Sequence, residues 1–164
     1  MSQYHLILIA AVLSFPLITV KAEESNLKPG DLLPAITLEN QHGKAINIDS
    51  QTRLLLFSAD MGGGKLVRKV VEKHESIAAL VNSETVRYLS DVSNMPSMIR
   101  RMMALPAMRK RPYPILLDTK GDTTANFPRQ PETVTLIQVN QLTITNISYS
   151  STAKQLAEAL NTLE

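Results

Sequence analysis

A continuous apolar run at residues 54–57 is followed by three consecutive glycines and then by a helical pattern. An apolar run without polar alternation is typical of a strand that is buried on both faces, as in a parallel sheet. We expect residues 53–58 to form this strand, Gly62 to Gly64 to form a tight exposed loop, and a helix to begin at Lys65. Because α/β folds often place functional groups in strand-to-helix loops, this loop is the first candidate site.

The segment after the loop has the period of an amphipathic helix. One face of residues 65–81 carries apolar side chains and the other is mostly charged. A short strand at 86–89 follows. Asn94 is a plausible cap for the next helix, which has Pro96 in its first turn and is expected to stop at Pro106.

Two pairs of short alternating runs predict β-hairpins, at 33–38 with 45–48 and at 134–139 with 142–147. A short extended run lies at 113–118, and Ser151 is expected to cap a last amphipathic helix. The order is a hairpin, a βαβ unit and then ββα. This predicts an α/β fold in which helices flank a central mixed sheet, with an added N-terminal β-hairpin.

Residues 1–22 resemble a secretory signal peptide. Residues 6–20 are almost entirely apolar, and Val20 and Ala22 are small residues at −3 and −1 of a cleavage site after Ala22. We therefore expect a folded domain at 23–164, a periplasmic or secreted location, and no membrane span after cleavage. Because residues 1–5 carry little positive charge, a retained N-terminal anchor is the alternative.

The 164 residues contain no cysteine, which excludes disulfides, a thiol nucleophile and thiolate metal sites. The net charge of +2 gives no indication of nucleic-acid binding. No spacing typical of a hydrolase triad or a zinc site is present, and we expect no cofactor.

Three motifs resemble those of the thioredoxin-like proteins of the TlpA and peroxiredoxin (AhpC/TSA) group. Residues 28–38 resemble the group's G-x-x-x-P-x-F-x-L start, residues 42–44 its D-x-x-G-K turn, and residues 113–121 its YPVLLD-x-x-G segment. The resemblance covers most of residues 27–163 and implies a thioredoxin-like fold. Residues 95–109 are also similar to a stretch in exported proteobacterial proteins, a similarity that implies no activity.

The same resemblance implies that dithiol chemistry is absent. Aligned with the group's F-x-A-x-W-C-x-x-C loop, Phe57 and Ala59 match, whereas Gly62 and Lys65 occupy the two cysteine positions. Pro131 is the best match for the group's cis-proline. We expect a redox-inactive protein that binds an unknown protein partner or small ligand at the former active-site edge.

The candidate ligand-binding residues follow from this alignment and from the strand ends. Free N–H groups at a helix N-terminus favour an anion, and Lys65 adds a charge, although a loop without a ligand is the simpler explanation. Asp60 and Asp91 end neighbouring strands, where open α/β sheets bind ligands. The candidate set is Asp60, Met61, Gly62, Gly63, Gly64, Lys65, Asp91 and Pro131.

Two other hypotheses remain open. Met95, Met98 and Met102 share a helical face, and thioether ligands suit Cu(I), so a periplasmic copper-binding protein is one alternative. Methionines also fill irregular cores and line adaptable binding surfaces. The second alternative is a non-thiol enzyme that uses Asp60 and Asp91 as an acid–base pair.

Overall fold

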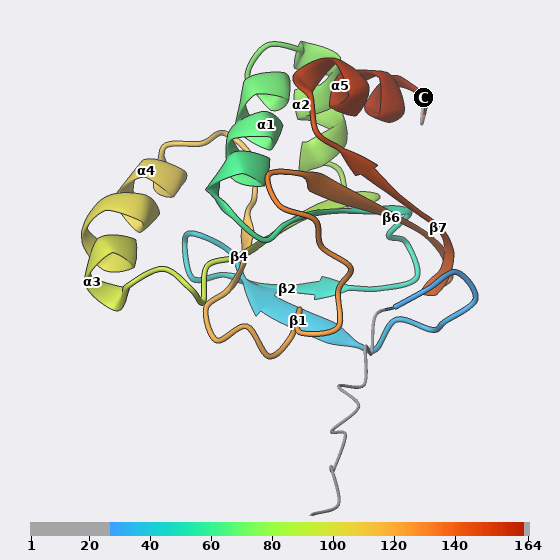
Figure 1. The fold of residues 1–164 in the computed structure, drawn as a ribbon, viewed down its shortest axis with the longest axis horizontal. Helices are drawn as coiled ribbons and strands as arrows, with labels where there is room; N and C mark the ends of the chain where they lie inside the picture. The colour runs from blue at the N-terminus through green and yellow to red at the C-terminus, as the bar shows by residue number, and fades with distance from the viewer. Residues whose placement is uncertain (1–26, 163–164) are drawn as a thin grey trace, which may run out of the picture.

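The computed structural model describes residues 27–162, so the expected signal peptide lies outside the described residues. A five-stranded sheet forms the centre, in the order β5-β4-β3-β6-β7 (Figure 1). Its strands are β3 (Leu54–Ser58), β4 (Val86–Asp91), β5 (Leu116–Asp118), β6 (Val134–Asn140) and β7 (Thr143–Ser150). The strands β3, β4 and β5 are parallel, whereas β6 and β7 run antiparallel to their neighbours. The predicted mixed sheet is confirmed.

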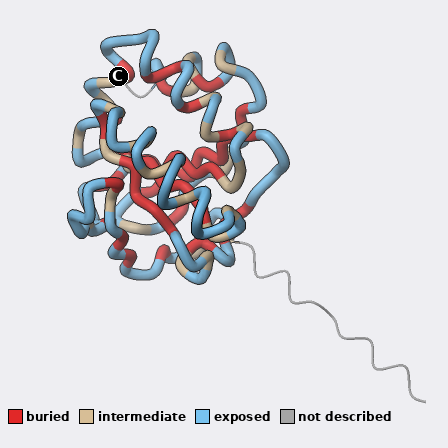
Figure 2. Tube along the Cα trace, turned by 90° about the vertical axis from the view of Figure 1, so that its left-hand side faces the viewer, coloured by how far each residue is buried: buried red, intermediate tan, exposed pale blue. Residues whose placement is uncertain are grey.

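The N-terminal hairpin is also confirmed, because β1 (Ile36–Glu39) and β2 (Ala45–Ile48) pair in a separate antiparallel sheet. Every residue of β3 is buried, and alternate side chains enter two different cores. Leu54 and Leu56 pack on the side of the helices, whereas Leu55 and Phe57 pack on the side of the hairpin. Figure 2 shows this buried centre in red, inside exposed outer segments. The hairpin therefore covers the face of the sheet that the helices leave open.

The helical segment after β3 differs from the prediction in two ways. It begins at Met61 rather than at Lys65, because the Asp60 side chain caps it by accepting the Gly63 N–H at 2.9 Å. It is also two helices, α1 (Met61–Val71) and α2 (Glu75–Asn82). The apolar spacing does not reveal the break because both helices bury their apolar sides in the same core.

Gly62, Gly63 and Gly64 therefore form the first turn of α1, and the expected exposed loop is wrong. The reason is a close approach between this turn and the chain before β6. A Cβ atom at Gly63 would lie 2.3 Å from the Thr133 carbonyl oxygen, and one at Gly62 would lie 2.9 Å from the Glu132 Cα. These two glycines are needed for packing rather than for a turn conformation.

An arm of three short helical segments extends from the sheet between β4 and β5. It consists of α3 (Ser97–Ile99), the π-helical η1 (Arg100–Ala104) and α4 (Leu105–Arg109). The predicted Asn94 cap is wrong because the first helical residue is Ser97, after Pro96. The predicted stop at Pro106 is also wrong. The Leu105 N–H donates to the Arg100 carbonyl, which makes a π turn. After this turn Pro106 lies in the first turn of α4, where the missing N–H of a proline costs little.

The C-terminal region follows the prediction more closely. β6 and β7 form the second hairpin, and α5 (Ala153–Asn161) packs against α1. The cap of α5 is Thr152 rather than Ser151, because the Thr152 Oγ1 accepts the Gln155 N–H at 3.2 Å. Within residues 27–162 no helix has the length and apolar character needed to cross a bilayer.

Candidate functional site

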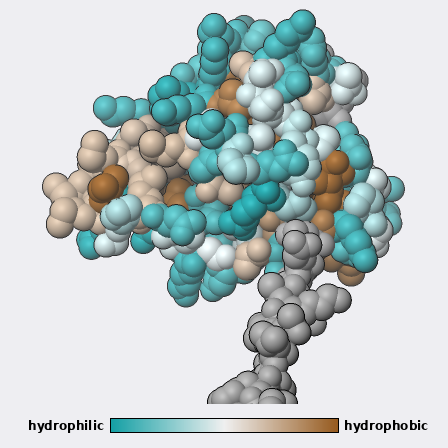
Figure 3. All heavy atoms as spheres, in the orientation of Figure 1, coloured by the Kyte–Doolittle hydropathy of each residue, from teal (hydrophilic) through white to brown (hydrophobic). Residues whose placement is uncertain are grey.

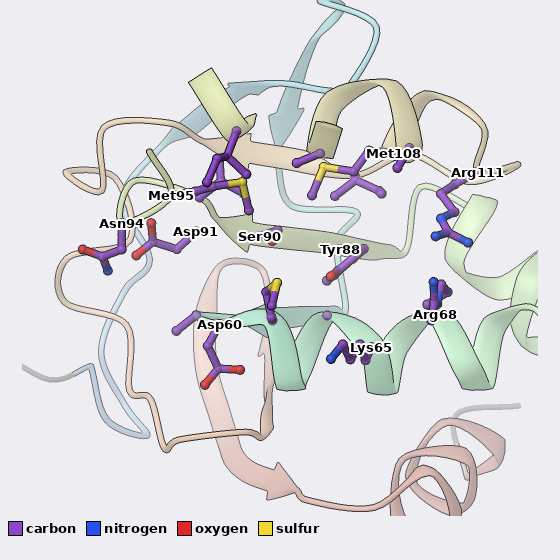
Figure 4. Close-up of a pocket in the computed structure, with 18 of the residues that line it drawn as sticks. Asp60, Lys65, Arg68, Tyr88, Ser90, Asp91, Asn94, Met95, Met108 and Arg111 are labelled. Carbon is purple, nitrogen blue, oxygen red and sulfur yellow. The ribbon is translucent and has the colours of Figure 1, made fainter. Parts of the chain in front are cut away.

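A pocket of about 630 Å³ lies between α1 and the α3–α4 arm (Figure 4). Tyr88 and Ser90 of β4 line it together with Tyr113 and Ile115, which precede β5. The volume falls within the range of about 300–1,000 Å³ that is common for ligand sites. The pocket lies at the carboxyl end of β4 and beside the first turn of α1, which is the edge predicted from the sequence.

The wall that the arm contributes is mainly apolar. It consists of Ile99, Ala104, Ala107 and Met108, and the segment between β4 and the arm adds Val92, Met95 and Pro96. Figure 4 shows the sulfur atoms of Met95 and Met108 on this side of the pocket. An apolar wall with a few polar groups is typical of sites for small organic ligands or for the side chains of a bound peptide.

The opposite wall and one end of the pocket carry positive charge. Lys65 and Arg68 project from the outer part of α1, and Arg111 follows α4. Arg68 and Arg111 lie at the same end in Figure 4, from opposite sides of the opening. Arg111 forms an ion pair with Glu72, in which the arginine is the less exposed partner. The remaining N–H groups of the two guanidinium groups make this end a potential site for an anion.

Asp60 and Asp91 lie at the other end of the pocket (Figure 4). The Asp60 Oδ1 accepts the Gly63 N–H, and its Oδ2 accepts the Glu132 N–H at 2.7 Å. The Asp91 carboxylate is 2% exposed and pairs with Arg129 at 3.0 Å. Both carboxylates therefore hold segments of the chain in place, so their contacts indicate a structural role more than an acid–base role.

Two tyrosine hydroxyls lie among the groups that line the pocket. The Tyr88 hydroxyl is 3.0 Å from the Ser58 Oγ, which in turn donates to the Ser90 Oγ. Burial raises the pKa of Tyr88 above its ordinary value, against the opposing effect of these hydroxyl contacts. Burial also raises the pKa of Tyr113 to about 12, so both groups are neutral near pH 7.

The position of Tyr113 is set by a residue from the N-terminal hairpin. The buried Gln41 side chain donates to the Tyr113 carbonyl and accepts the Ile115 N–H, both at 2.8 Å. The backbone carbonyl of Gln41 accepts a hydrogen bond from the Arg109 Nε–H at 3.0 Å. One residue of the hairpin therefore fixes both the residues before β5 and the end of the arm.

The segment before β6 packs against the first turn of α1. Glu132 has a positive φ of 58°, a conformation that is uncommon for residues other than glycine. The Glu132 N–H donates to the Asp60 Oδ2. No peptide bond between residues 27 and 162 is cis, so Pro131 differs in this respect from the cis-proline with which it was aligned.

The predicted ligand-binding residues are only partly brought together. Asp60, Met61, Gly64, Lys65 and Asp91 line the pocket, whereas Gly62, Gly63 and Pro131 do not. Gly62 and Gly63 pack against residues 132–133 instead. The strand ends and the first turn of α1 thus converge as expected, but only the outward side of that turn contributes to the pocket.

The predicted methionine set is divided between two environments. Met95 lines the pocket, whereas Met98 and Met102 lie outside it and are 71% and 72% exposed. Among residues 27–162 no group of three or more His, Asp or Glu side chains is placed to hold a metal ion. Copper binding by Met95, Met98 and Met102 stays a prediction.

Several pocket residues were not identified from the sequence: Arg68, Tyr88, Met108, Arg111 and Tyr113. Met108 and Arg111 follow Pro106 in the chain. Ending the helix at Pro106 separated them from the site. Tyr88 is the aromatic residue of β4, and a tyrosine on a buried strand usually needs a partner for its hydroxyl, which is a signal that could have identified it.

No protein-family model and no curated protein matches this sequence. The solved structures that resemble it have a thioredoxin-like fold, and so does this chain. The thioredoxin domain of a thiol-disulfide oxidoreductase from Bacteroides vulgatus has a TM-score of 0.52 at 12% identity, over 84% of this chain and 99% of that one. The peroxidoxin BcpB from Mycobacterium tuberculosis has a TM-score of 0.54 at 14% identity, over 85% and 99%.

A third similar structure is the pneumococcal exposed lipoprotein thioredoxin from Streptococcus pneumoniae. Its TM-score is 0.54 at 12% identity, over 79% of this chain and 99% of that one. At these identities the similarity establishes the fold. This chain therefore has the thioredoxin-like fold that the motifs indicated, and its sequence contains no cysteine.

Proposed function

We propose that this chain is an exported thioredoxin-fold protein that performs no thiol chemistry and binds a ligand in the pocket beside α1. The ligand is a small molecule or a segment of a protein partner. The observation that carries the proposal is the pocket of about 630 Å³, which combines an apolar wall with a cationic end at the former active-site edge.

The absence of cysteine supports the non-redox part of the proposal. Dithiol exchange requires a thiolate nucleophile, and none of the 164 residues can supply one. Gly62 and Lys65 occupy the aligned cysteine positions, and neither side chain forms a comparable covalent intermediate with a disulfide.

Two observations support export. Residues 1–22 have the apolar stretch and the small residues of a cleavable signal peptide. One of the similar structures is described as an exposed lipoprotein. Export is tested by N-terminal sequencing of the protein from an envelope fraction, where the expected first residue is Glu23. A chain that remains in the cytosol with residues 1–22 attached would contradict it.

The exposed methionines of the arm favour a protein partner as one kind of ligand. Met98, Met102 and Met103 are each about two-thirds exposed or more, and Met61 is similarly exposed beside the pocket. Figure 3 shows hydrophobic residues over the part of the surface where Figure 1 places α3 and α4. Exposed methionines are adaptable contacts for apolar groups of another protein.

The non-redox part is tested by an insulin-reduction assay on residues 23–164. We expect no turnover above the rate without protein. Turnover that persists after purification to homogeneity would overturn this part of the proposal.

The binding part is tested with N-phenyl-1-naphthylamine, a neutral apolar probe that fluoresces when it leaves water. We expect saturable binding, which an Ala104→Phe substitution in the pocket wall removes. Ala79→Phe is the matched control, because Ala79 lies on the exposed side of α2 outside the pocket. Equal binding by the wild type and Ala104→Phe, or no saturable binding at all, would contradict the proposed site.

A further inference from the structure

The cationic groups of the pocket are concentrated at one end, and this asymmetry constrains the chemistry of a ligand. Arg68 and Arg111 lie at that end, whereas Lys65 lies on α1 between Asp60 and Arg68 (Figure 4). Glu72 is the acidic side chain paired with Arg111. Asp60 and Asp91 lie at the opposite end (Figure 4) and are already hydrogen-bonded. A ligand with one anionic end would match this distribution, and its remaining part would face the apolar wall.

A hydrogen-bond donor lies near the same end. The Tyr113 side chain lines the pocket, and the residue is only 3% exposed. Its hydroxyl has no hydrogen-bond partner among the residues that the structure describes. Arg68, Arg111 and Glu72 are close enough to influence it electrostatically. A hydroxyl without a protein partner gains a hydrogen bond to the ligand if the ligand supplies an acceptor oxygen.

A carboxylate suits these groups better than a dianion. Guanidinium groups pair with carboxylates through two parallel N–H···O bonds. Glu72 already neutralises part of the positive charge at this end. The apolar wall formed by Met95, Ile99 and Met108 then provides the surface for a hydrocarbon chain.

We propose that the pocket binds an apolar monocarboxylate, of the size of a medium-chain fatty acid, with its carboxylate at Arg68, Arg111 and Tyr113 and its hydrocarbon chain against Met95, Ile99 and Met108. This inference rests on the proposed binding function and names its ligand class. The carboxylate accepts from the two guanidinium groups and from the Tyr113 hydroxyl, and the chain replaces water on the apolar wall.

The test compares decanoate with decan-1-ol, which has the same chain and no charge. Each is titrated as a competitor of N-phenyl-1-naphthylamine, below its solubility limit. We expect decanoate to bind about tenfold more tightly, which corresponds to the loss of charge-assisted hydrogen bonds in the alcohol. Arg68→Gln should weaken decanoate much more than decan-1-ol and so remove most of this difference.

Two further variants separate specific contacts from general attraction. Lys69→Gln removes one positive charge from the same helix outside this pocket, and its effect on decanoate should be much smaller than that of Arg68→Gln. Tyr113→Phe removes only the hydroxyl and should weaken decanoate several-fold. In protein labelled with ¹³C at the methionine methyl groups, decanoate should shift Met95 and Met108 but not Met98 or Met102.

The outcomes distinguish the inference from the function on which it rests. Equal affinities for decanoate and decan-1-ol, or equal effects of Lys69→Gln and Arg68→Gln, would overturn the carboxylate site and leave the apolar pocket intact. Binding of decyl phosphate at least tenfold tighter than decanoate would overturn the choice of a carboxylate. If the neutral probe itself does not bind saturably, the proposed function fails as well.

Discussion

Asp60 joins α1 to the segment before β6, because its carboxylate accepts the Glu132 N–H at 2.7 Å and the Gly63 N–H at 2.9 Å. The contact with Glu132 links residues that are 72 positions apart in the chain. Glu132 donates this hydrogen bond from a positive-φ conformation. The capping residue therefore sets both the start of the helix and the position of the neighbouring loop.

Asp60→Ala should lower the free energy of unfolding by about 2 kcal/mol, because it removes a helix cap and leaves the Glu132 N–H unpaired. Asp60→Asn keeps one acceptor oxygen and should cost about half as much. Urea denaturation measures both values. Equal stabilities for the wild type and Asp60→Ala would show that neither contact contributes.

Two adjacent glycines of α1 should respond to alanine with opposite signs. A Cβ at Gly63 would lie 2.3 Å from the Thr133 carbonyl oxygen, so Gly63→Ala should destabilise the protein by about 2 kcal/mol or more. At Gly64 the nearest atom is the Tyr88 hydroxyl at 3.6 Å, an ordinary contact. Gly64→Ala should therefore stabilise the helix by up to about 1 kcal/mol. Urea denaturation of both variants tests the pair, and equal signs would contradict the packing described here.

Gln41→Ala should destabilise the protein by about 3 kcal/mol, because it leaves the buried Ile115 N–H and Tyr113 carbonyl without partners. The exposed neighbour His42 is the control, and His42→Ala should change stability by no more than about 0.5 kcal/mol. Gln41→Ala should also weaken binding of the neutral probe, since Tyr113 and Ile115 line the pocket. A stable Gln41→Ala variant would show that other contacts hold residues 113–115.

The raised pKa of Tyr113 predicts a loss of stability at high pH. The ordinary pKa is 10.0 and the folded value is about 12. The stabilisation from the neutral hydroxyl is complete below about pH 10. It falls as the pH rises to about 12, because the unfolded chain then loses this proton while the folded chain keeps it. Urea denaturation between these pH values should show a smaller decline in Tyr113→Phe than in the wild type; an equal decline would refute the assignment.

Glu72 competes with a bound carboxylate for Arg111. Glu72→Gln should therefore raise the affinity for decanoate about twofold to fivefold, the range expected from removing an exposed ion pair. The affinity for decan-1-ol should not change. A competition titration with the neutral probe measures both, and weaker decanoate binding in Glu72→Gln would place the carboxylate elsewhere.

The strands were predictable because their signals are local. The apolar run at residues 54–57 follows from burial of both faces of β3, and the alternation at residues 36–39 follows from burial of one face of β1. The first turn of α1 was not predictable in this way. Consecutive glycines favour a loop by intrinsic propensity. Here Asp60 caps a helix, and the Thr133 carbonyl, which is far away in sequence, leaves no room for a side chain at Gly63.

The edge of the sheet at which the pocket lies could be predicted from the sequence, but most of the side chains that line the pocket could not. Asp60 and Asp91 follow from the rule for strand ends, and both line the pocket. Arg111 and Met108 depend on how the chain continues past Pro106. The π turn in η1 that permits this continuation has no clear signature in the sequence.

The packing at Gly62 bears on whether dithiol chemistry could be introduced at this edge of the sheet. Gly62 occupies one of the two aligned cysteine positions, and a Cβ there would lie 2.9 Å from the Glu132 Cα. A cysteine at this position therefore requires the backbone around Glu132 to move first. Introducing a dithiol at this edge would therefore demand coordinated change in two distant parts of the chain, the first turn of α1 and the backbone before β6.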